Sequence, residues 1–498
     1  MGRFGMGCAG VALLLMLGSA ASETYIVKPD GTGDFPTIQA AIDAAVGGDV
    51  IELADGVFTG SGNRDLDYGG KAIRIASESG DARECVIDCQ GNGRGFHFHS
   101  GEGPGSELAD VTVRNGNAEA GGTIFCEQSS PSVVGCILTQ SSAQGGGGIM
   151  CMESSPAFSR CSVTLNETSN HGGGYLGRDS SPAFEDCDFR GNRAPTDIGG
   201  GVSAAGTSSP TFLRCVFTGN MCGYKGGAMV VSEYCDAVVE DCTFSGNTAQ
   251  YGAGITCAVF SEPIISNCTF HRNAAQGGSA LECYWGANAA VERSIFAFST
   301  QGNAVNLVDG AATLTCVNIY GNAGGDWVGP IADQYGVNGN ISQDPLFCQA
   351  ASIDVPLGIH SDSPCAPFSP PNADCDLIGA WPVSCGTLVE LPRPEPPSAS
   401  GSGERLELCL ISGNPATGGS VLQYTIPEGA GAAPVCLRII DPSGRIVRTL
   451  VGKAQGPGVH TVAWDGTGEH GRRAGPGIYL CRLCWRDRIE TSRVALIR

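Results

Sequence analysis

Short apolar runs recur along the middle of the chain with a period close to 26 residues. One cysteine marks each repeat, with an apolar residue three positions before it, another two positions after it and an asparagine five positions after it. The runs are rich in β-branched and aromatic residues and are broken by Gly and Asn, a pattern that indicates strands and turns. The cysteine column is Cys136, Cys161, Cys187, Cys215, Cys242 and Cys268, followed by Ser294. The apolar column after it is Leu138, Val163, Phe189, Phe217, Phe244, Phe270 and Phe296, and the asparagine column is Asn166, Asn192, Asn220, Asn247 and Asn273.

A repeat of this length built from strands predicts one coil of a parallel β-helix. The Leu-x-x-Leu-x-Leu signature of leucine-rich repeats is absent, and so is the spacing of helical repeats. Equivalent residues of neighbouring coils lie about 4.8 Å apart, so the cysteine and phenylalanine columns are expected to stack inside the coil. The asparagines are expected to form a ladder at a turn and to adopt a left-handed backbone there, with Gly serving other such turns. We expect some nine coils between Val111 and about Cys316.

The residue before each column cysteine is expected to face solvent, because the cysteine faces inward. The signs of its charge nearly alternate along the chain, which predicts an ion-pair ladder between coils on the outer surface. These residues are Gly135, Arg160, Asp186, Arg214, Asp241, Asn267 and Arg293.

Composition supports a repeat protein and narrows its partners. Glycine accounts for 75 of the 498 residues, which suits many tight turns. The formal net charge of −21 argues against binding to nucleic acid. The acidity is uneven, because residues 404–498 hold 12 Lys and Arg against 8 Asp and Glu and are therefore net basic.

Residues 1–22 have the pattern of a signal peptide, with a short apolar core and small residues before the expected cleavage point. No later segment approaches the length of an apolar membrane span. The protein is therefore expected to be secreted, either extracellular or held at a bacterial cell surface.

The cysteines divide into two groups. The column cysteines are expected to be free and buried, because stacked side chains point in parallel while a disulfide needs its Cβ atoms turned towards each other. The four best disulfide candidates are Cys348, Cys365, Cys375 and Cys385, and their pairing cannot be deduced. A small disulfide loop between Cys85 and Cys89 is an additional alternative.

The opening segment, YIVKPDGTGDFPTIQAAIDAAVGGDVIELADGVF from Tyr25 to Phe58, resembles the start of pectin methylesterases and other pectate-lyase-like β-helix proteins. This resemblance implies an amphipathic helix from Ile38 to Ala45 that caps the end of the coil. The repeats, with their C-x-F-x-G-N pattern and glycine triplets, resemble bacterial polymorphic outer-membrane proteins and other right-handed β-helix surface proteins. Residues 339–385 resemble the closing segment of exported β-helix proteins that end in sorting domains.

The C-terminal part resembles the FlgD-like immunoglobulin-like domain, through Asn414-Pro415, LRIIDPSG from Leu437, VHTVAWDG from Val459 and GPGIYL from Gly475. Alternating strands and Asp-Pro-Ser-Gly and Asp-Gly-Thr-Gly turns independently favour a sandwich. The predicted fold is all-β, a right-handed single-stranded parallel β-helix followed by a small immunoglobulin-like β-sandwich. Its parts are a signal peptide (1–22), the β-helix (23–386), a Pro/Ser/Gly linker (387–405) and the FlgD-like domain (406–498). Within the helix, 23–88 form the cap and first coils, 111–322 the repeats and 339–386 the closing segment.

Few residues indicate chemistry. The densest candidate is Glu185, Asp186, Asp188 and Arg190, where Asp186 and Asp188 would share a strand face and could ligate Ca²⁺, although the charge ladder already explains Asp186. His97 and His99 could bind a metal but have no third ligand nearby. His171 and His271 are expected in turns in different columns. Cys481 and Cys484 should face opposite sides of a strand, which makes a shared metal improbable. No catalytic, cofactor-binding or metal-binding residue is assigned.

These patterns predict a surface protein that is adhesin-like, or that binds glycans along its flank or serves as a structural element. Its expected partners are polysaccharides or cell-surface components, with no nucleic acid. The resemblance of the C-terminal domain implies a sorting or assembly role, through contact with the outer membrane or the secretion machinery. The alternative is a carbohydrate-active enzyme of the pectate-lyase-like fold, namely a lyase, esterase or hydrolase. The later motifs of the pectin methylesterases and the Asp-Asp pair of polygalacturonases are absent from the sequence.

Overall fold

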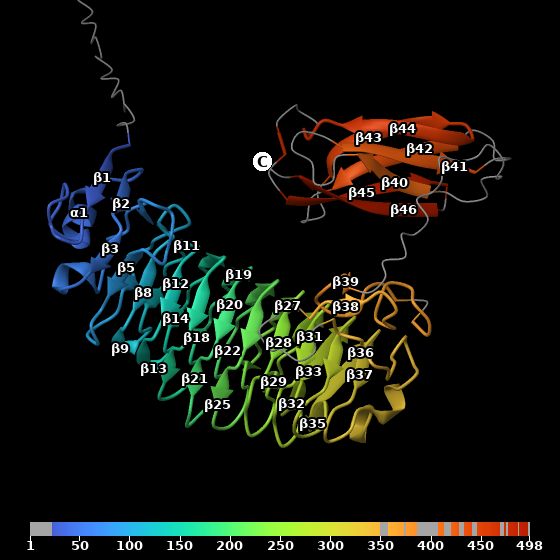
Figure 1. The fold of residues 1–498 in the computed structure, drawn as a ribbon, viewed down its shortest axis with the longest axis horizontal. Coiled ribbons are helices and arrows are strands. Elements are labelled where there is room, and N and C mark those ends of the chain that lie inside the picture. The colour runs from blue at the N-terminus through green and yellow to red at the C-terminus, as the bar shows by residue number, and fades with distance from the viewer. Residues whose placement is uncertain are drawn as a thin grey trace, which may run out of the picture. The chain divides into compact units, whose positions relative to one another are not determined.

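The fold comes from a computed structural model of the chain (Figure 1). The structure describes residues 22–348, 357–372, 375–385, 407–412, 420–427, 433–440, 446–468, 473–474, 477–486 and 488–496. The chain divides into two compact units, Met1–Leu388 and Val389–Arg498. The expected signal peptide and linker lie almost entirely outside the described residues.

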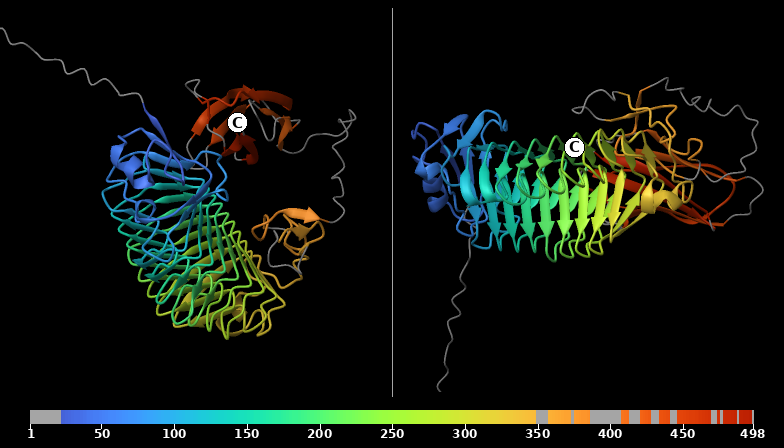
Figure 2. Two further views of the ribbon diagram at one scale, coloured as in Figure 1. Left: turned by 60° about the vertical axis from the view of Figure 1, so that its left-hand side comes forward. Right: turned by 90° about the horizontal axis from the view of Figure 1, so that it is seen from below.

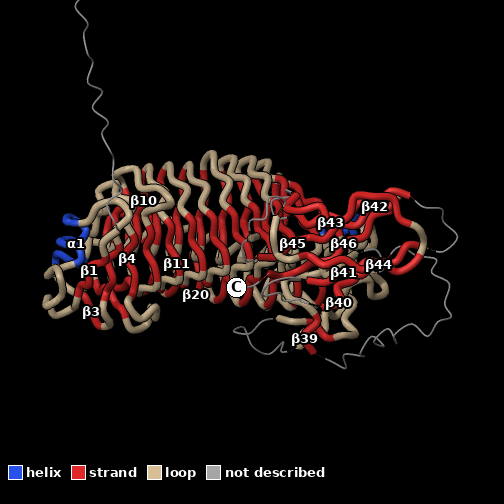
Figure 3. The backbone as a smooth tube through the Cα atoms, turned by 90° about the horizontal axis from the view of Figure 1, so that it is seen from above, coloured by secondary structure: helices blue, strands red, loops and turns tan. Residues whose placement is uncertain are grey.

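The first unit is a parallel β-helix whose coils are stacked in register (Figure 2). Three long sheets and one short sheet run along it, and all their strands pair in parallel. The sheets are named A, B, C and D below. One coil runs from sheet A to sheet B, then through sheet D to sheet C, as in the coil of β11 (Ser132–Val134), β12 (Ile137–Thr139), β13 (Ser142–Gly145) and β14 (Ile149–Met152). Short strands alternate with turns and loops around each coil (Figure 3).

Sheet A contains β1 (Thr24–Val27), β2 (Val50–Leu53), β4 (Arg74–Ser77), β7 (Glu107–Ala109), β11 (Ser132–Val134), β15 (Ala157–Ser159), β19 (Ala183–Glu185), β23 (Thr211–Leu213), β27 (Val238–Glu240), β30 (Ile264–Ser266), β33 (Asn288–Glu292) and β36 (Ala311–Thr315). Sheet B contains β3 (Gly56–Phe58), β5 (Cys85–Asp88), β8 (Thr112–Arg114), β12 (Ile137–Thr139), β16 (Ser162–Thr164), β20 (Asp188–Arg190), β24 (Val216–Thr218), β28 (Thr243–Ser245), β31 (Thr269–His271), β34 (Ile295–Ala297) and β37 (Asn318–Tyr320).

Sheet C contains β6 (Phe96–Phe98), β10 (Ile124–Glu127), β14 (Ile149–Met152), β18 (Tyr175–Arg178), β22 (Val202–Ala205), β26 (Met229–Ser232), β29 (Ile255–Ala258), β32 (Leu281–Tyr284) and β35 (Val305–Val308). Sheet D contains β9 (Asn117–Ala120), β13 (Ser142–Gly145), β17 (Glu167–Thr168), β21 (Arg193–Ala194) and β25 (Met221–Cys222).

The predicted columns lie inside the coil. The six column cysteines are free and buried, and Cys161 and Cys187 belong to adjacent coils because Ser162 pairs with Asp188. Phenylalanine rings stack face to face from coil to coil, with centroids 5.0 Å apart for Phe189 and Phe217 and 4.7 Å apart for Phe217 and Phe244. The predicted count of nine coils also holds, since nine sheet-B strands lie between Thr112 and Tyr320.

The asparagine ladder forms as expected, but its residues do not adopt the left-handed backbone conformation that was predicted for them. Asn220 Oδ1 accepts hydrogen bonds from the backbone N–H (3.0 Å) and the Nδ2 (3.0 Å) of Asn192. Asn220 Nδ2 donates to the Phe189 carbonyl (2.8 Å) and to Asn247 Oδ1 (3.1 Å). The ladder residues are buried, and the left-handed residue is the one before each of them, such as Gly219 before Asn220 (φ 62°). The amide must point into the coil to reach the next one, so the bend falls one position earlier than predicted.

The predicted charge column forms a left-handed turn between sheets A and B. Its members include Arg160 (φ 53°), Asp186 (φ 54°) and Arg214 (φ 53°), where the sequence had predicted Gly for such turns. Hydrogen bonds between coils hold these residues in place, as from the Arg160 N–H to the Glu185 carbonyl (2.9 Å). The ladder includes an ion pair between Arg214 and Asp186 (2.7 Å) and a hydrogen bond from Arg293 to Asn267 (2.8 Å).

The start of the β-helix is covered by the predicted helix, α1 (Ile38–Ala44), which buries Ile38, Ala41 and Ile42. Its N-terminus is capped by Thr37 Oγ1, which accepts a hydrogen bond from the Ala40 N–H (3.3 Å). The short 3₁₀ helix η1 (Ser61–Asn63) lies against it, and Asn63 Oδ1 accepts from the Ile38 N–H (2.9 Å).

The closing segment lies on the outer face of sheet B in the last coils, after the 3₁₀ helix η2 (Gly329–Gln334). Trp381 Nε1 donates to Thr243 Oγ1 (2.7 Å), and the Ala380 N–H donates to Thr269 Oγ1 (2.9 Å). The segment contributes the two-stranded sheet of β38 (Ile359–His360) and β39 (Val383–Cys385) and an apolar cluster that includes Ile295 and Ile378.

Two disulfides hold this segment, Cys316–Cys375 and Cys348–Cys385. The prediction for Cys365 is wrong, because this thiol is free and buried. Cys316 takes its place because it occupies the outward turn position that Arg293 holds in the preceding coil, with φ 54°. The alternative of a Cys85–Cys89 loop is also wrong, since both thiols are free and buried.

The second unit is a β-sandwich of two antiparallel sheets. One sheet contains β40 (Glu407–Ser412), β41 (Ser420–Ile426) and β44 (Gly458–Trp464), and the other contains β43 (Ile446–Gln455), β42 (Ala433–Ile440), β45 (Gly477–Trp485) and β46 (Arg488–Leu496). Side chains from both sheets share its core, such as Leu422, Trp464 and Ile439. Cys481 is buried in this core, whereas the side chain of Cys484 lies outside the described residues.

Candidate functional site

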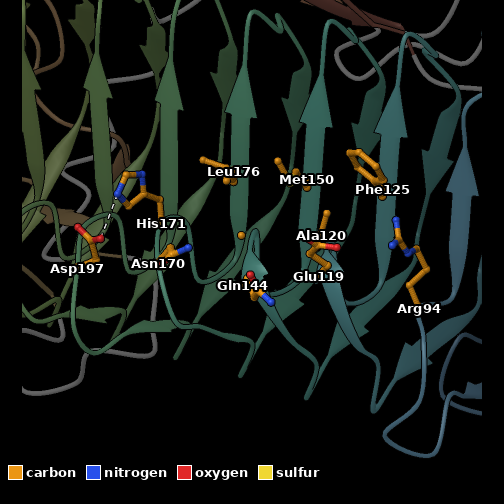
Figure 4. A pocket seen from close by; sticks show the side chains of 11 residues that line it. Arg94, Glu119, Ala120, Phe125, Gln144, Met150, Asn170, His171, Leu176 and Asp197 are labelled. Carbon is orange, nitrogen blue, oxygen red and sulfur yellow. Dashed lines mark ion pairs between the residues drawn. The ribbon is translucent and has the colours of Figure 1, made fainter.

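A groove of about 590 Å³ lies on the outside of the β-helix, where sheet C meets the turn that leads from sheet D (Figure 4). Its floor is the outward column of sheet C, in which Phe125, Met150 and Leu176 are equivalent residues of successive coils. Its rim consists of Glu119, Gln144, Asn170, His171 and Asp197. The groove therefore has an apolar floor and a rim of planar side chains that can form hydrogen bonds.

Arg94 closes one end of the groove. Its guanidinium lies over the Phe125 ring, 5.1 Å from the centroid, and burial lowers its pKa. His97 stacks on the same ring with centroids 4.9 Å apart, and burial, followed by the nearby Arg94 charge, lowers the pKa of His97 to about 4. His97 is thus neutral at pH 7, and Arg94 supplies the charge at this end.

The opposite part of the rim is held by His171, whose Nε2 lies 3.1 Å from Asp197 Oδ2. These residues come from neighbouring coils, because the Gly172 N–H donates to the Ile198 carbonyl (3.2 Å) next to Asp197. A second hollow of about 500 Å³ adjoins the rim along sheet D and shares Glu119 and Gln144 with the groove. A ligand that filled both hollows would therefore contact several coils at once.

Further along the same face, large side chains fill the positions that are equivalent to the groove. Lys225 lies one coil beyond Ile198, is only 8% exposed, and pairs with the buried Glu282 (3.0 Å). Its ammonium also lies 3.9 Å from the Tyr284 ring centroid and 5.2 Å from that of Tyr251. This cluster gives the later coils a packed surface and leaves the groove to the earlier ones.

The acidic candidates of the sequence analysis do not converge on a site. Asp186 lies in the turn before β20 and pairs with Arg214, which also contacts Glu185. Asp188 follows on sheet B and pairs with Arg190 (3.3 Å). Asp186 and Asp188 therefore do not share a strand face as predicted, because the left-handed bend separates them.

The histidine candidates have different surroundings. His97 and His99 stack on each other with centroids 4.1 Å apart, opposite the buried Phe96 and Phe98. His271 is not in a turn, because it ends β31 and is buried beneath the closing segment, with the Phe347 ring 5.4 Å away. Across the part of the chain that the structure describes, no three His, Cys, Asp or Glu side chains are grouped to hold a metal ion.

Two family profiles match the sequence, one in each unit of the chain. The profile described as right handed beta helix region matches residues 55–231 and 168–323, which together span more than half of the chain. The chain belongs to this right-handed β-helix family. The FlgD Ig-like domain profile matches residues 413–483 of this β-helix protein. No curated protein matches it.

The groove of this β-helix protein was not predicted from the sequence. The floor residues Phe125, Met150 and Leu176 share a column, but that column continues as Ser203 and Val230 and shows no periodic identity. The one available signal was the two-residue alternation within each sheet-C strand, which leaves an apolar residue facing outward at these coils. Among the helices described, none is long and apolar enough to cross a membrane.

Proposed function

We propose that this protein binds a glycan chain along the groove of its β-helix and acts by attachment and not by catalysis. The observation that carries the proposal is the combination of an apolar floor, Phe125, Met150 and Leu176, with a rim of planar polar side chains. Sugars present apolar C–H faces and a ring of hydroxyls, so a site of this composition matches both parts of their surface.

The size and form of the groove support this ligand class. Its volume of about 590 Å³ falls in the range of small-molecule sites, about 300–1,000 Å³. The floor extends over three successive coils at about 4.8 Å per coil, which suits two or three sugar units of an extended chain.

The rim can distinguish glycans by their hydroxyl pattern. Gln144 and Asn170 each present an acceptor and donors, Glu119 accepts only, and Arg94 donates only. Hydroxyls of the ligand can satisfy both kinds of group. The groups that such a ligand leaves unpaired would oppose its binding.

The test is a titration of the full chain with cellohexaose, xylohexaose, chitohexaose and hexagalacturonate, followed by calorimetry. We expect one of these to bind, and Gln144→Ala and Asn170→Ala to weaken its binding by about 3- to 12-fold each, the equivalent of a lost hydrogen bond of about 0.7–1.5 kcal/mol. Gln250→Ala is the matched control, because Gln250 is exposed in the same turn column outside the groove.

Binding that Gln144→Ala and Gln250→Ala change equally would contradict the proposal, and so would a failure of all four probes to bind. The same incubations also test the enzymatic alternative. Release of shorter products by the wild type, with loss of that activity in Glu119→Gln, would replace attachment with catalysis in this groove.

A further inference from the structure

A second surface of the β-helix exposes large apolar side chains. Its three aromatic residues lie at the turns from sheet C to sheet A, whereas Ile264 begins β30 on sheet A and Val308 ends β35 on sheet C. Tyr234, Phe260 and Trp285 are 61%, 56% and 63% exposed, and Ile264 and Val308 are also exposed. These five residues, here named the aromatic ridge, come from successive coils. The Tyr234 N–H donates to the Val259 carbonyl (3.0 Å), the Phe260 N–H donates to the Trp285 carbonyl (3.1 Å), and Val308 pairs with Tyr284. Contiguous exposed apolar patches usually mark a binding surface.

The ridge is specific to these coils. The same turn in earlier coils carries Gln128, Glu153 and Asp179, all polar residues in the left-handed conformation. In the later coils Glu233 and Val259 occupy that position, and a second left-handed residue follows each of them, Tyr234 (φ 65°) and Phe260 (φ 58°). Bulky side chains are disfavoured in this conformation, and the turn itself does not require them. The aromatic side chains therefore have a role other than forming the turn.

Ring packing fixes the shape of the ridge. Tyr234 and Phe260 stack with centroids 5.7 Å apart, and the Phe260 ring lies over Gly286, where an added Cβ would approach it to 2.6 Å. Trp285 packs edge to face on Tyr284, with centroids 5.0 Å apart. A surface ordered before binding loses little conformational entropy when a partner docks.

Carboxylates flank the ridge. Asp236 and Glu262 follow Tyr234 and Phe260 by two residues each, and they lie in adjacent coils because Asp236 Oδ1 accepts a hydrogen bond from the Glu262 N–H (2.9 Å). Asp309 lies beside Trp285 in the next coil, since its carbonyl accepts from the Gly286 N–H (2.6 Å). All three side chains are exposed. This charge opposes nucleic acid, acidic glycans and anionic lipid surfaces.

We infer that the aromatic ridge binds a segment of another protein that carries Lys or Arg between apolar side chains. The rings offer apolar contact area and cation–π faces, and the carboxylates pair with the same cations. The flanking carboxylates favour a cationic polypeptide over a glycan, because they pair with Lys and Arg side chains whereas sugar hydroxyls carry no positive charge. Trp and Tyr are also among the residues that contribute most to protein interfaces.

A short synthetic peptide of alternating Lys and Leu, titrated into the full chain, tests this inference by calorimetry. We expect Phe260→Ser to weaken binding at least about tenfold, as for a central interface residue. Asp236→Asn/Glu262→Gln leaves every apolar side chain in place, and it should weaken binding and reduce its salt dependence. The same peptide with Glu in place of Lys should not bind.

Leu165→Ala is the matched control, because Leu165 is also exposed (59%) and left-handed (φ 56°) but lies at a different turn. Equal peptide affinity of the wild type and both ridge variants would show that net charge alone attracts the peptide, and would overturn the inference. Binding of cellohexaose that is lost in Phe260→Ser but retained in Gln144→Ala would assign the ridge to glycans and also overturn it.

Discussion

Replacing Asn220 with alanine tests whether the buried asparagine ladder holds the coils together. The substitution removes all four hydrogen bonds of the Asn220 side chain, two as acceptor and two as donor. It leaves the Asn192 backbone N–H and the Phe189 carbonyl buried without these partners. Each such group costs about 1–3 kcal/mol, so the free energy of unfolding should fall by about 2–6 kcal/mol.

Urea unfolding followed by far-UV circular dichroism measures this loss, with Asn117→Ala as the control on the exposed face of sheet D. Native-state hydrogen exchange should also show faster exchange in the coils on either side of Asn220, because each coil of a solenoid is stabilised chiefly by its neighbours. If Asn220→Ala unfolds at the same urea concentration as Asn117→Ala, the ladder does not contribute as its geometry indicates.

Three further measurements follow from buried groups. Lys225→Met should destabilise the protein by about 3–5 kcal/mol because it leaves Glu282 buried without its partner, and adding Glu282→Leu should recover most of that loss in thermal unfolding. Burial lowers the pKa of His271 from 6.5 to about 4, so the unfolded state binds the proton more tightly and stability falls as the pH drops from 6.5 towards 4. His271→Phe should remove on the order of 3 kcal/mol of that pH dependence, and equal slopes for both proteins would refute this. The six column thiols are buried, so a thiol reagent should reach them after unfolding without reductant and not before; burial also raises the pKa of Cys136 to about 12.

The sequence was sufficient for the parts of the fold that repeat. The cysteine, phenylalanine and asparagine columns recur at one period, and equivalent residues must stack when each repeat forms one coil. Local bends were harder to predict. The left-handed residue precedes each ladder asparagine, and glycine marks it in only three of the five coils (Gly191, Gly219 and Gly246), because Leu165 and Arg272 occupy it in the other two.

The groove and the Cys316–Cys375 disulfide could not be found in the same way, because they depend on outward positions. Inward residues are constrained by neighbours above and below, whereas Phe125, Met150 and Leu176 are constrained by none of the periodic features. Cys316 shares its column with arginine and aspartate, so only the fold of the closing segment over sheet B shows that it meets Cys375.

Because the coils are stacked in register, the groove and the aromatic ridge are separated by a whole number of coils. Deleting one complete repeat between them, such as residues 198–224, would join Asp197 to Lys225, which occupies the backbone position equivalent to Ile198. The two surfaces would then approach by one step of about 4.8 Å while each kept its own residues. The number of coils between the two surfaces therefore sets, in steps of one coil, the distance between two ligands bound at the same time.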